Sequence, residues 1–168
     1  MKRIALLALL DLLPALSALA ADGGWTRMET ALEPGVTRID LRREATPCDV
    51  RMVALARAAL PGLRFHVRQA GGGTISPTHE VGNYPRTLVG LGPGKIVLFV
   101  ADGRSSRSKS LPSREAAALL AAEGCTDAVQ FDGGGSTTLL AGGEVLNRPS
   151  DGRPRKVAEG LFLTLPAR

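Results

Sequence analysis

The chain has 168 residues, of which 44% are hydrophobic and 22% charged, a composition typical of one globular domain with a real core. The net charge is +5, but aromatic residues make up only 4% and no basic cluster is interleaved with them. These properties argue against a disordered chain and against a nucleic-acid-binding protein.

The N-terminus reads as an export signal. Lys2 and Arg3 precede a mostly apolar run, and Ala18 and Ala20 supply the small residues expected before a cleavage site. We therefore predict a signal peptide over residues 1–20 and a periplasmic or secreted protein; an uncleaved anchor and a buried N-terminal helix are the alternatives. No later segment is long and apolar enough to predict a stable membrane span.

Export would bring two cysteines, Cys48 and Cys125, into an oxidising compartment. They could form a disulfide there, or they could be two separate buried thiols. With the two scattered histidines, His66 and His79, they do not make a zinc site.

The first half of the mature chain reads as strands. Alternating apolar residues predict strands over 36–41 and 49–56, and a shorter strand is predicted over 63–67. Residues 69–85 are rich in glycine and turn residues, which predicts a long loop of the kind that is often functional.

The second half begins with a predicted hairpin. Strands over 87–91 and 96–101 flank Gly92-Pro93-Gly94, and the second strand is apolar almost throughout, as expected for burial on both faces. A helix over 113–123 follows, with Ser113 as a plausible N-cap and Gly124 after its end.

Four short strands are predicted after the helix, over 127–131, 137–141, 144–146 and 157–165. No repeat or low-complexity linker divides the chain. The sequence therefore predicts one α+β domain over residues 21–168, with a mixed β-sheet and one main helix.

Residues 131–138 carry the strongest signal for chemistry. A carboxylate, Asp132, follows a predicted strand and precedes three glycines and three hydroxyl residues. Glycines let backbone N–H groups approach a ligand closely, and such groups suit anions, phosphate included. The alternative is a glycine-rich bend with a polar tip.

Further polar residues lie at the ends of other predicted strands. Arg86 precedes one strand, Asp102 and Arg104 follow another, and Asn147 and Arg148 follow a later one. If these strands are neighbours, one rim of the sheet holds two carboxylates, several arginines and a row of N–H groups. Such a rim would suit an anionic substrate and acid–base chemistry.

The order of these blocks closely resembles the phosphodiester glycosidase family over residues 85–168, and residues 34–67 resemble its opening strands less specifically. The resemblance implies an α+β domain of that family and hydrolysis at a glycosyl phosphodiester. Five blocks in the same order carry it: residues 85–90, 100–104, 123–124, 131–138, and 145–150 with 155–157.

On this basis Asp132 and Asp102 are the predicted catalytic carboxylates. The predicted substrate is a glycan or sugar phosphate, with no cofactor, although a divalent cation at the two aspartates stays open. The residues predicted to bind phosphate or sugar hydroxyls are Arg86, Arg104, Gly133, Gly134, Gly135, Ser136, Thr137, Asn147 and Arg148.

The chain departs from the family pattern in one respect. An Asn-Gly-Gly-Phe-Phe-like block is expected upstream of Arg86, and the chain contains neither an Asn-Gly nor a Phe-Phe dipeptide. We interpret this as an internal deletion near residues 69–85. Two alternatives to an enzyme follow: an exported module that binds anions or glycans without turnover, and a shortened remnant without a stable fold.

Overall fold

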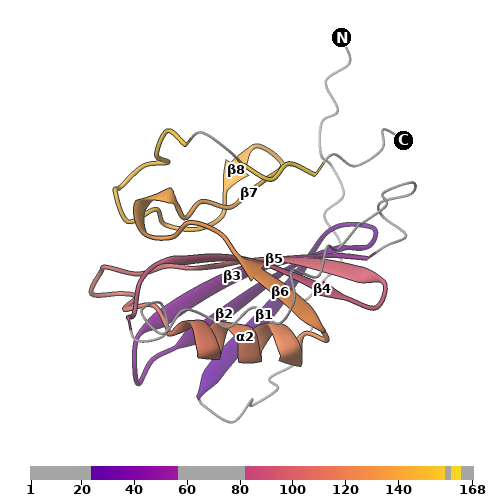
Figure 1. Ribbon diagram of the computed structural model, residues 1–168, viewed down its shortest axis with the longest axis horizontal. Helices are drawn as coiled ribbons and strands as arrows, with labels where there is room; N and C mark the ends of the chain where they lie inside the picture. Colours follow the sequence, from indigo (N-terminus) through magenta and orange to yellow (C-terminus); the bar gives the residue numbers. More distant parts are fainter. Residues whose placement is uncertain (1–23, 57–81, 158–159, 164–168) are drawn as a thin grey trace, which may run out of the picture.

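The computed structural model describes residues 24–56, 82–157 and 160–163, and its centre is a six-stranded sheet (Figure 1). The strand order is β1-β2-β3-β5-β4-β6, and every neighbouring pair is antiparallel. The α+β prediction is confirmed in its coarse form, but the predicted mixed sheet is wrong, because the described strands contain no parallel pair. The strands are β1 (Trp25–Glu33), β2 (Val36–Arg43), β3 (Cys48–Ala56), β4 (Arg86–Gly92), β5 (Lys95–Ala101) and β6 (Asp127–Gln130).

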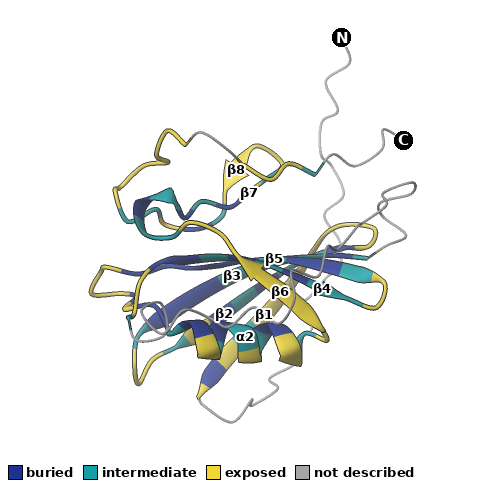
Figure 2. Ribbon diagram, viewed as in Figure 1, coloured by how far each residue is buried: buried dark blue, intermediate teal, exposed yellow. Residues whose placement is uncertain are grey.

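The sheet is covered on both faces (Figures 1 and 2). Helix α2 (Ser113–Ala122) packs on one face, and the chain after β6 crosses the other. That later segment contains the 3-10 turn η2 (Gly134–Ser136) and the small hairpin of β7 (Leu140–Ala141) and β8 (Glu144–Val145). We call the two sides the helix face and the loop face.

Strand β5 is apolar almost throughout because both of its faces are buried. Val97 and Phe99 join the cluster on the helix face, whereas Ile96 and Val100 join the cluster on the loop face. Successive side chains of a strand point to opposite faces, so a strand covered on both sides needs apolar residues at every position. The burial predicted on both faces is confirmed.

The strands predicted over 36–41, 49–56, 87–91 and 96–101 are confirmed within one or two residues of their bounds. The predicted helix is also confirmed, but Ser113 is its first residue and Pro112 takes the N-cap position without a side-chain hydrogen bond. Strand β1 was not predicted. Its apolar Met28 and Leu32 are exposed, so the amphipathic signal of a half-buried strand is missing.

The end of the chain is less regular than predicted. The strand expected over 137–141 shrinks to Leu140–Ala141, and no strand forms at Val157 or over 160–163. The predicted signal peptide, the strand over 63–67 and most of the loop over 69–85 lie outside the described residues. No helix in the described ranges is long and apolar enough to cross a bilayer.

The two cysteines are both free in the structure, which corresponds to the alternative of separate thiols rather than to a disulfide between Cys48 and Cys125. Cys48 is the first residue of β3. Cys125 packs against Gly90, which is level with Ala54 of β3, because Gly90 and Ala54 are both paired with Val97 of β5. Six residues of β3 separate those levels, or about 20 Å along the strand. A disulfide needs Cα atoms within about 7 Å, so these thiols cannot meet.

Candidate active site

Three strand ends meet at one end of the sheet. Arg86 is paired with Ala101 on β5, and Leu88 is paired with Gln130 on β6. Asp102 and Asp132 therefore follow two strands that flank β4 on either side. With neighbouring strands about 4.8 Å apart, the backbones at these two aspartates lie about 10 Å apart. At the level of the backbone, the predicted rim is present.

The glycine loop, residues 132–136, packs against the start of β4. The N–H of Gly134 donates to the carbonyl of Pro85 at 2.9 Å, and a Cβ at Gly133 would lie 2.4 Å from that same oxygen. Only glycine at 133 permits this approach. Gly134 also has φ +61°, a conformation that favours glycine.

Most backbone N–H groups of the glycine loop already donate hydrogen bonds within the protein. Gly133 N–H donates to Oδ1 of Asp132, and Ser136 N–H donates to the carbonyl of Gly133. Thr137 N–H likewise donates to the carbonyl of Gly134. The expected row of free N–H groups is therefore not what the loop presents, because closing the 3-10 turn engages those groups within the protein. An anion would have to rely on side chains here.

Asp132 is exposed and its charge is well supported. Hydrogen bonding from Ser136 lowers the pKa of the Asp132 carboxyl, and the Gly133 N–H and the positive charge of Arg155 act in the same direction. The side chain is therefore ionised at neutral pH. It can act as a base, as a nucleophile or as a stabiliser of positive charge.

Asp132 lines a groove of about 560 Å³ on the loop face of the sheet. The floor comes from β4 and β5, through Val89, Leu98 and Val100, and Ser136 stands beside Asp132 at one side. The opposite wall is the C-terminal segment. The residues of that segment that line the groove are Pro154, Arg155, Lys156, Val157, Gly160, Leu161 and Phe162, and Phe131 lines it as well.

Arg104 lies beside the glycine loop, as the sequence predicted. A Cβ built on Gly134 would be 3.2 Å from Nη2 of Arg104, so the guanidinium rests directly against that glycine. It also lies over the ring of Tyr84, 5.8 Å from the ring centre. Arg104 itself has φ +58°, which is rare for a residue with a side chain.

Asp102 is buried behind the site and does not line the groove. Its Oδ1 accepts hydrogen bonds from Nδ2 of Asn147 at 3.2 Å and from the N–H of Arg148 at 2.9 Å. Its Oδ2 is buried and has no hydrogen-bond partner in the described ranges. Burial raises the pKa of the Asp102 carboxyl, although these hydrogen bonds and the charge of Arg51 oppose that shift.

Asn147 and Thr137 are also buried, with 6% and 1% of their surface exposed. Oδ1 of Asn147 accepts from the N–H of Leu139, and its Nδ2 donates to the carbonyl of Thr137 as well as to Asp102. The hydroxyl of Thr137 bonds to that of Thr87 at 3.3 Å. Both side chains are therefore engaged inside the protein, which disfavours the predicted contact with sugar hydroxyls.

Arg86 belongs to the helix face. It shares the strand parity of Leu88, and its Nε donates to the carbonyl of Leu111 at 2.7 Å. Its other nitrogens donate to the carbonyl of Gly82 and to Oε1 of Gln130. Arg86 therefore ties β4 to β6 and to the start of α2, and it does not converge with Arg104. The side chain of Arg148, by contrast, is exposed next to Asp102.

Sequence reasoning missed an ionic network on the loop face. Asp40 lies between two arginines, with Nε of Arg51 and Nε of Arg38 each 2.8 Å from one of its carboxylate oxygens. Asp40 and Arg51 are direct cross-strand partners, and Asp49, which is 2% exposed, is paired with Arg42. The sequence does show charged residues at every second position of these strands. That pattern is also typical of the solvent-facing side of a strand, so it does not by itself indicate a network.

A divalent cation at the two aspartates finds no support in the donor set. Within the described ranges, no three His, Cys, Asp or Glu side chains gather as a metal site requires. We therefore assign no step to a metal.

Comparison with known proteins adds a family to this geometry. The sequence model described as phosphodiester glycosidase matches residues 43–164. The SPbeta prophage-derived uncharacterized protein YomE of Bacillus subtilis (strain 168) is 36% identical over 84 residues, which are 49% of this chain and 13% of that protein.

A solved structure is similar over the same share of the chain. It is the crystal structure of a protein inferred to be exported, from Burkholderia pseudomallei K96243, with 36% identity and a TM-score of 0.42. The match covers 49% of this chain and 17% of that one. The chain thus spans less than a fifth of the length of either relative.

Proposed function

The chain belongs to the phosphodiester glycosidase family, and from that premise we propose that it hydrolyses the glycosidic bond of a sugar phosphodiester in envelope or extracellular glycans. One observation carries the proposal. Asp132 is an exposed, ionised carboxylate at the mouth of a groove, and it leads into a loop against which the guanidinium of Arg104 rests.

The substrate decides what the site must supply. The bond to be broken joins the anomeric carbon of a sugar to a phosphate oxygen, and its electron pair leaves with a phosphate monoester. Such a group leaves well without protonation, so a general acid matters less than in ordinary glycoside hydrolysis. The site must hold the phosphate, stabilise positive charge on the sugar ring and deliver water.

We assign the sugar side of this task to Asp132. Its carboxylate stabilises the positive charge that develops at the anomeric carbon, and either it accepts a proton from the attacking water or it attacks that carbon itself. The water oxygen ends on the anomeric carbon, and its proton passes by way of Asp132 to the released phosphate. The Ser136 hydroxyl beside Asp132 orients a sugar hydroxyl.

We assign the phosphate to Arg104. A guanidinium presents parallel N–H donors that match two phosphate oxygens, and its contact with Gly134 holds it beside the loop. Arg148 is the second candidate for binding the phosphate. Its side chain is exposed, and its backbone N–H is held by Asp102.

We assign a positioning role to Asp102. Because its carboxylate binds both Asn147 and the backbone of Arg148, it fixes the segment that follows the glycine loop relative to the end of β5. Because Asp102 is buried, Asp132 is the carboxylate that lines the groove among the residues that the structure describes.

One observation favours the second candidate, an exported module that binds glycans without turnover. The predicted N–H donors are engaged within the glycine loop, and Asp102 and Asn147 are buried, so among the described residues Asp132 has no second carboxylate beside it in the groove. Retaining and inverting glycosidases both use two carboxyl groups near the bond.

The test is a screen of the full-chain protein against a panel of glycosyl phosphodiesters, with Asp132→Asn beside it. We expect Asp132→Asn to lower kcat by at least about 100-fold, the usual worth of a positioned acid–base group. Asp127→Asn is the matched control, since Asp127 is an exposed carboxylate at the other end of β6. Turnover that survives Asp132→Asn would refute the assignment, and saturable binding without turnover would favour the module.

A further inference from the structure

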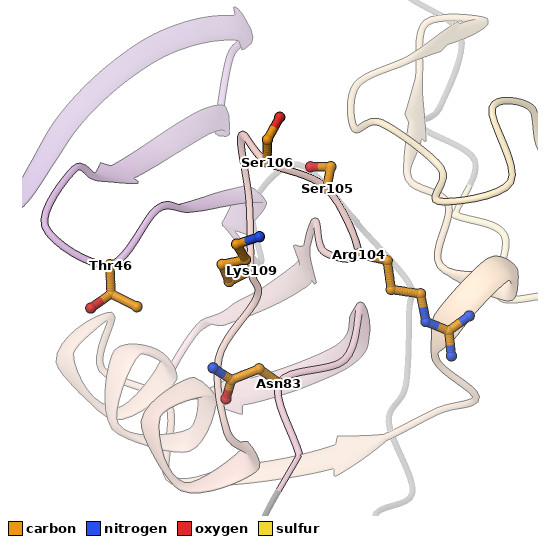
Figure 3. A pocket seen from close by; sticks show the side chains of 6 residues that line it. All are labelled: Thr46, Asn83, Arg104, Ser105, Ser106 and Lys109. Atoms are coloured by element: carbon orange, nitrogen blue, oxygen red, sulfur yellow. The ribbon is translucent and has the colours of Figure 1, made fainter.

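A second cavity, of about 550 Å³, opens on the other side of Arg104 (Figure 3). It lies between the turn that joins β2 to β3, the approach to β4, and the loop over residues 103–110. We call it the polar basin. Three hydroxyls, one carboxamide and two cations line it, and none of its lining residues carries a carboxylate: they are Thr46, Asn83, Arg104, Ser105, Ser106 and Lys109.

Within the part of the chain that the structure describes, the two cations of the polar basin have no acidic partner. Neither Arg104 nor Lys109 forms an ion pair with any residue that the structure describes. Arginines of the sheet are matched, as Arg43 is with Glu115 and Arg27 with Glu123. An unmatched Lys109 in the cavity, with a second unmatched cation at its edge, attracts an anion.

The loop that carries these cations is held in a fixed shape. The hydroxyl of Ser108 donates to the carbonyl of Asp102 at 2.7 Å and accepts from the N–H of Asp49 at 3.0 Å. The N–H of Ser108 donates to the hydroxyl of Ser105, also at 3.0 Å. Arg104 and Ser110 have φ of +58° and +69°, a strained state that persists only where the surroundings impose it.

Arg104 lies between the polar basin, which it lines, and the glycine loop that begins at Asp132. Figure 3 shows its side chain extending away from Lys109, toward the 3-10 turn that follows Asp132. Its guanidinium reaches Gly134 there. A phosphate held by Arg104 would therefore lie between the glycine loop and the polar basin.

We propose that the polar basin binds the acceptor arm of the phosphodiester, and that this arm is an anionic sugar. The inference rests on the proposed function, which places the glycosyl group in the groove. Hydroxyl and carboxamide side chains match sugar hydroxyls, and Lys109 matches a further negative charge, whether phosphate or carboxylate. A lipid or an aromatic acceptor would leave these polar groups without partners.

The first experiment measures binding without any turnover. Glucose 6-phosphate, glucuronate and glucose are titrated against the full-chain protein by isothermal calorimetry. We expect both anions to bind at least tenfold more tightly than glucose, and Lys109→Ala to remove that advantage. Arg107→Ala is the matched control, because Arg107 is an exposed cation of the same loop that does not line the basin, and it should leave all three affinities unchanged.

The second experiment measures turnover of two diesters that share a glycosyl group and differ in acceptor, a neutral hexose or a hexuronate. Lys109→Ala should raise KM for the hexuronate diester about tenfold with kcat unchanged. Lys109-dependent binding with no hydrolysis of either diester would refute the proposed hydrolysis and leave the anionic-sugar site standing. Equal binding of glucose and the two anions, or no effect of Lys109→Ala, would overturn the site itself.

Discussion

Asn147 joins the end of β5 to the segment after the glycine loop, because its Nδ2 donates to Oδ1 of Asp102 at 3.2 Å and to the carbonyl of Thr137 at 3.1 Å. One buried carboxamide thereby fixes two pieces of chain that lie far apart in the sequence. The candidate site depends on this connection, since the glycine loop begins only five residues before Thr137.

Replacing Asn147 with alanine should destabilise the protein. The N–H of Leu139 would lose its buried partner, at a cost of about 1–3 kcal/mol for a group left unsatisfied, and Oδ1 of Asp102 would keep only the N–H of Arg148. Urea denaturation measures the free energy of unfolding. Arg148→Ala is the control, because its N–H to Asp102 is a backbone group and survives, so its change should stay within about 0.5 kcal/mol. Equal losses in both variants would contradict this account.

Gly134→Ala should impair both stability and function. Its φ of +61° disfavours a side chain by about 1–2 kcal/mol, and the new Cβ would press against the Arg104 guanidinium. Gly142→Ala is a matched control, since Gly142 has φ +59° but open space around it. Both variants should lose similar stability, whereas only Gly134→Ala should raise KM for a glycosyl phosphodiester. A KM that rises equally in both would show that strain alone is responsible.

Asp102 should make stability fall as the pH rises. Burial raises its pKa in the folded state, so the folded protein binds this proton more tightly than the unfolded chain does. The resulting stabilisation is complete below the unfolded pKa of about 3.9 and is lost as the pH rises through the folded value.

Asp102→Asn tests this, because the carboxamide keeps the acceptor at Oδ1 and removes the charge. The free energy of unfolding of the variant should improve relative to the native protein between about pH 3 and pH 7, by about 1.4 kcal/mol for each unit of pKa shift. A difference between the two proteins that is constant across this range would show that the Asp102 pKa is not raised.

The thiol of Cys48 should resist alkylation in the folded protein. Burial raises its pKa to about 12, so almost no thiolate is present at pH 8. Iodoacetamide followed by mass spectrometry should label Cys125, which is only partly buried, well before Cys48. In denaturant without reductant both cysteines should react, and labelling that requires a reductant would instead reveal a disulfide.

Much of the framework could be predicted from the sequence because it rests on local rules. The alternation in β2 and β3, the unbroken apolar run of β5 and the turn at Gly94 each specify an element without knowledge of its neighbours. Strand β1 escaped prediction because Trp25 is buried whereas Met28 and Leu32 are exposed, so its apolar residues do not alternate with polar ones.

The sequence predicted which strand ends form the site better than it predicted which side chains face it. Asp132 and Arg104 do lie at the glycine loop, as their places after β6 and β5 suggested. Arg86 is the first residue of β4 rather than the residue before it, and strand parity turns its guanidinium to the helix face, where the carbonyl of Leu111 accepts from it. A shift of one residue along a strand reverses the face, and strand boundaries are seldom known that well from sequence.

The sequence by itself determined the family, the order of the main elements and the place of the glycine loop, since periodicity, turn residues and motif spacing are written along the chain. Only the tertiary structure decided which polar groups face the groove and which are enclosed. Asp102, Asn147 and Asp132 are equally polar in the sequence, but burial and hydrogen bonding depend on what packs around each one. Those surroundings come from segments distant in the chain, and they raise the pKa of one aspartate while lowering that of the other.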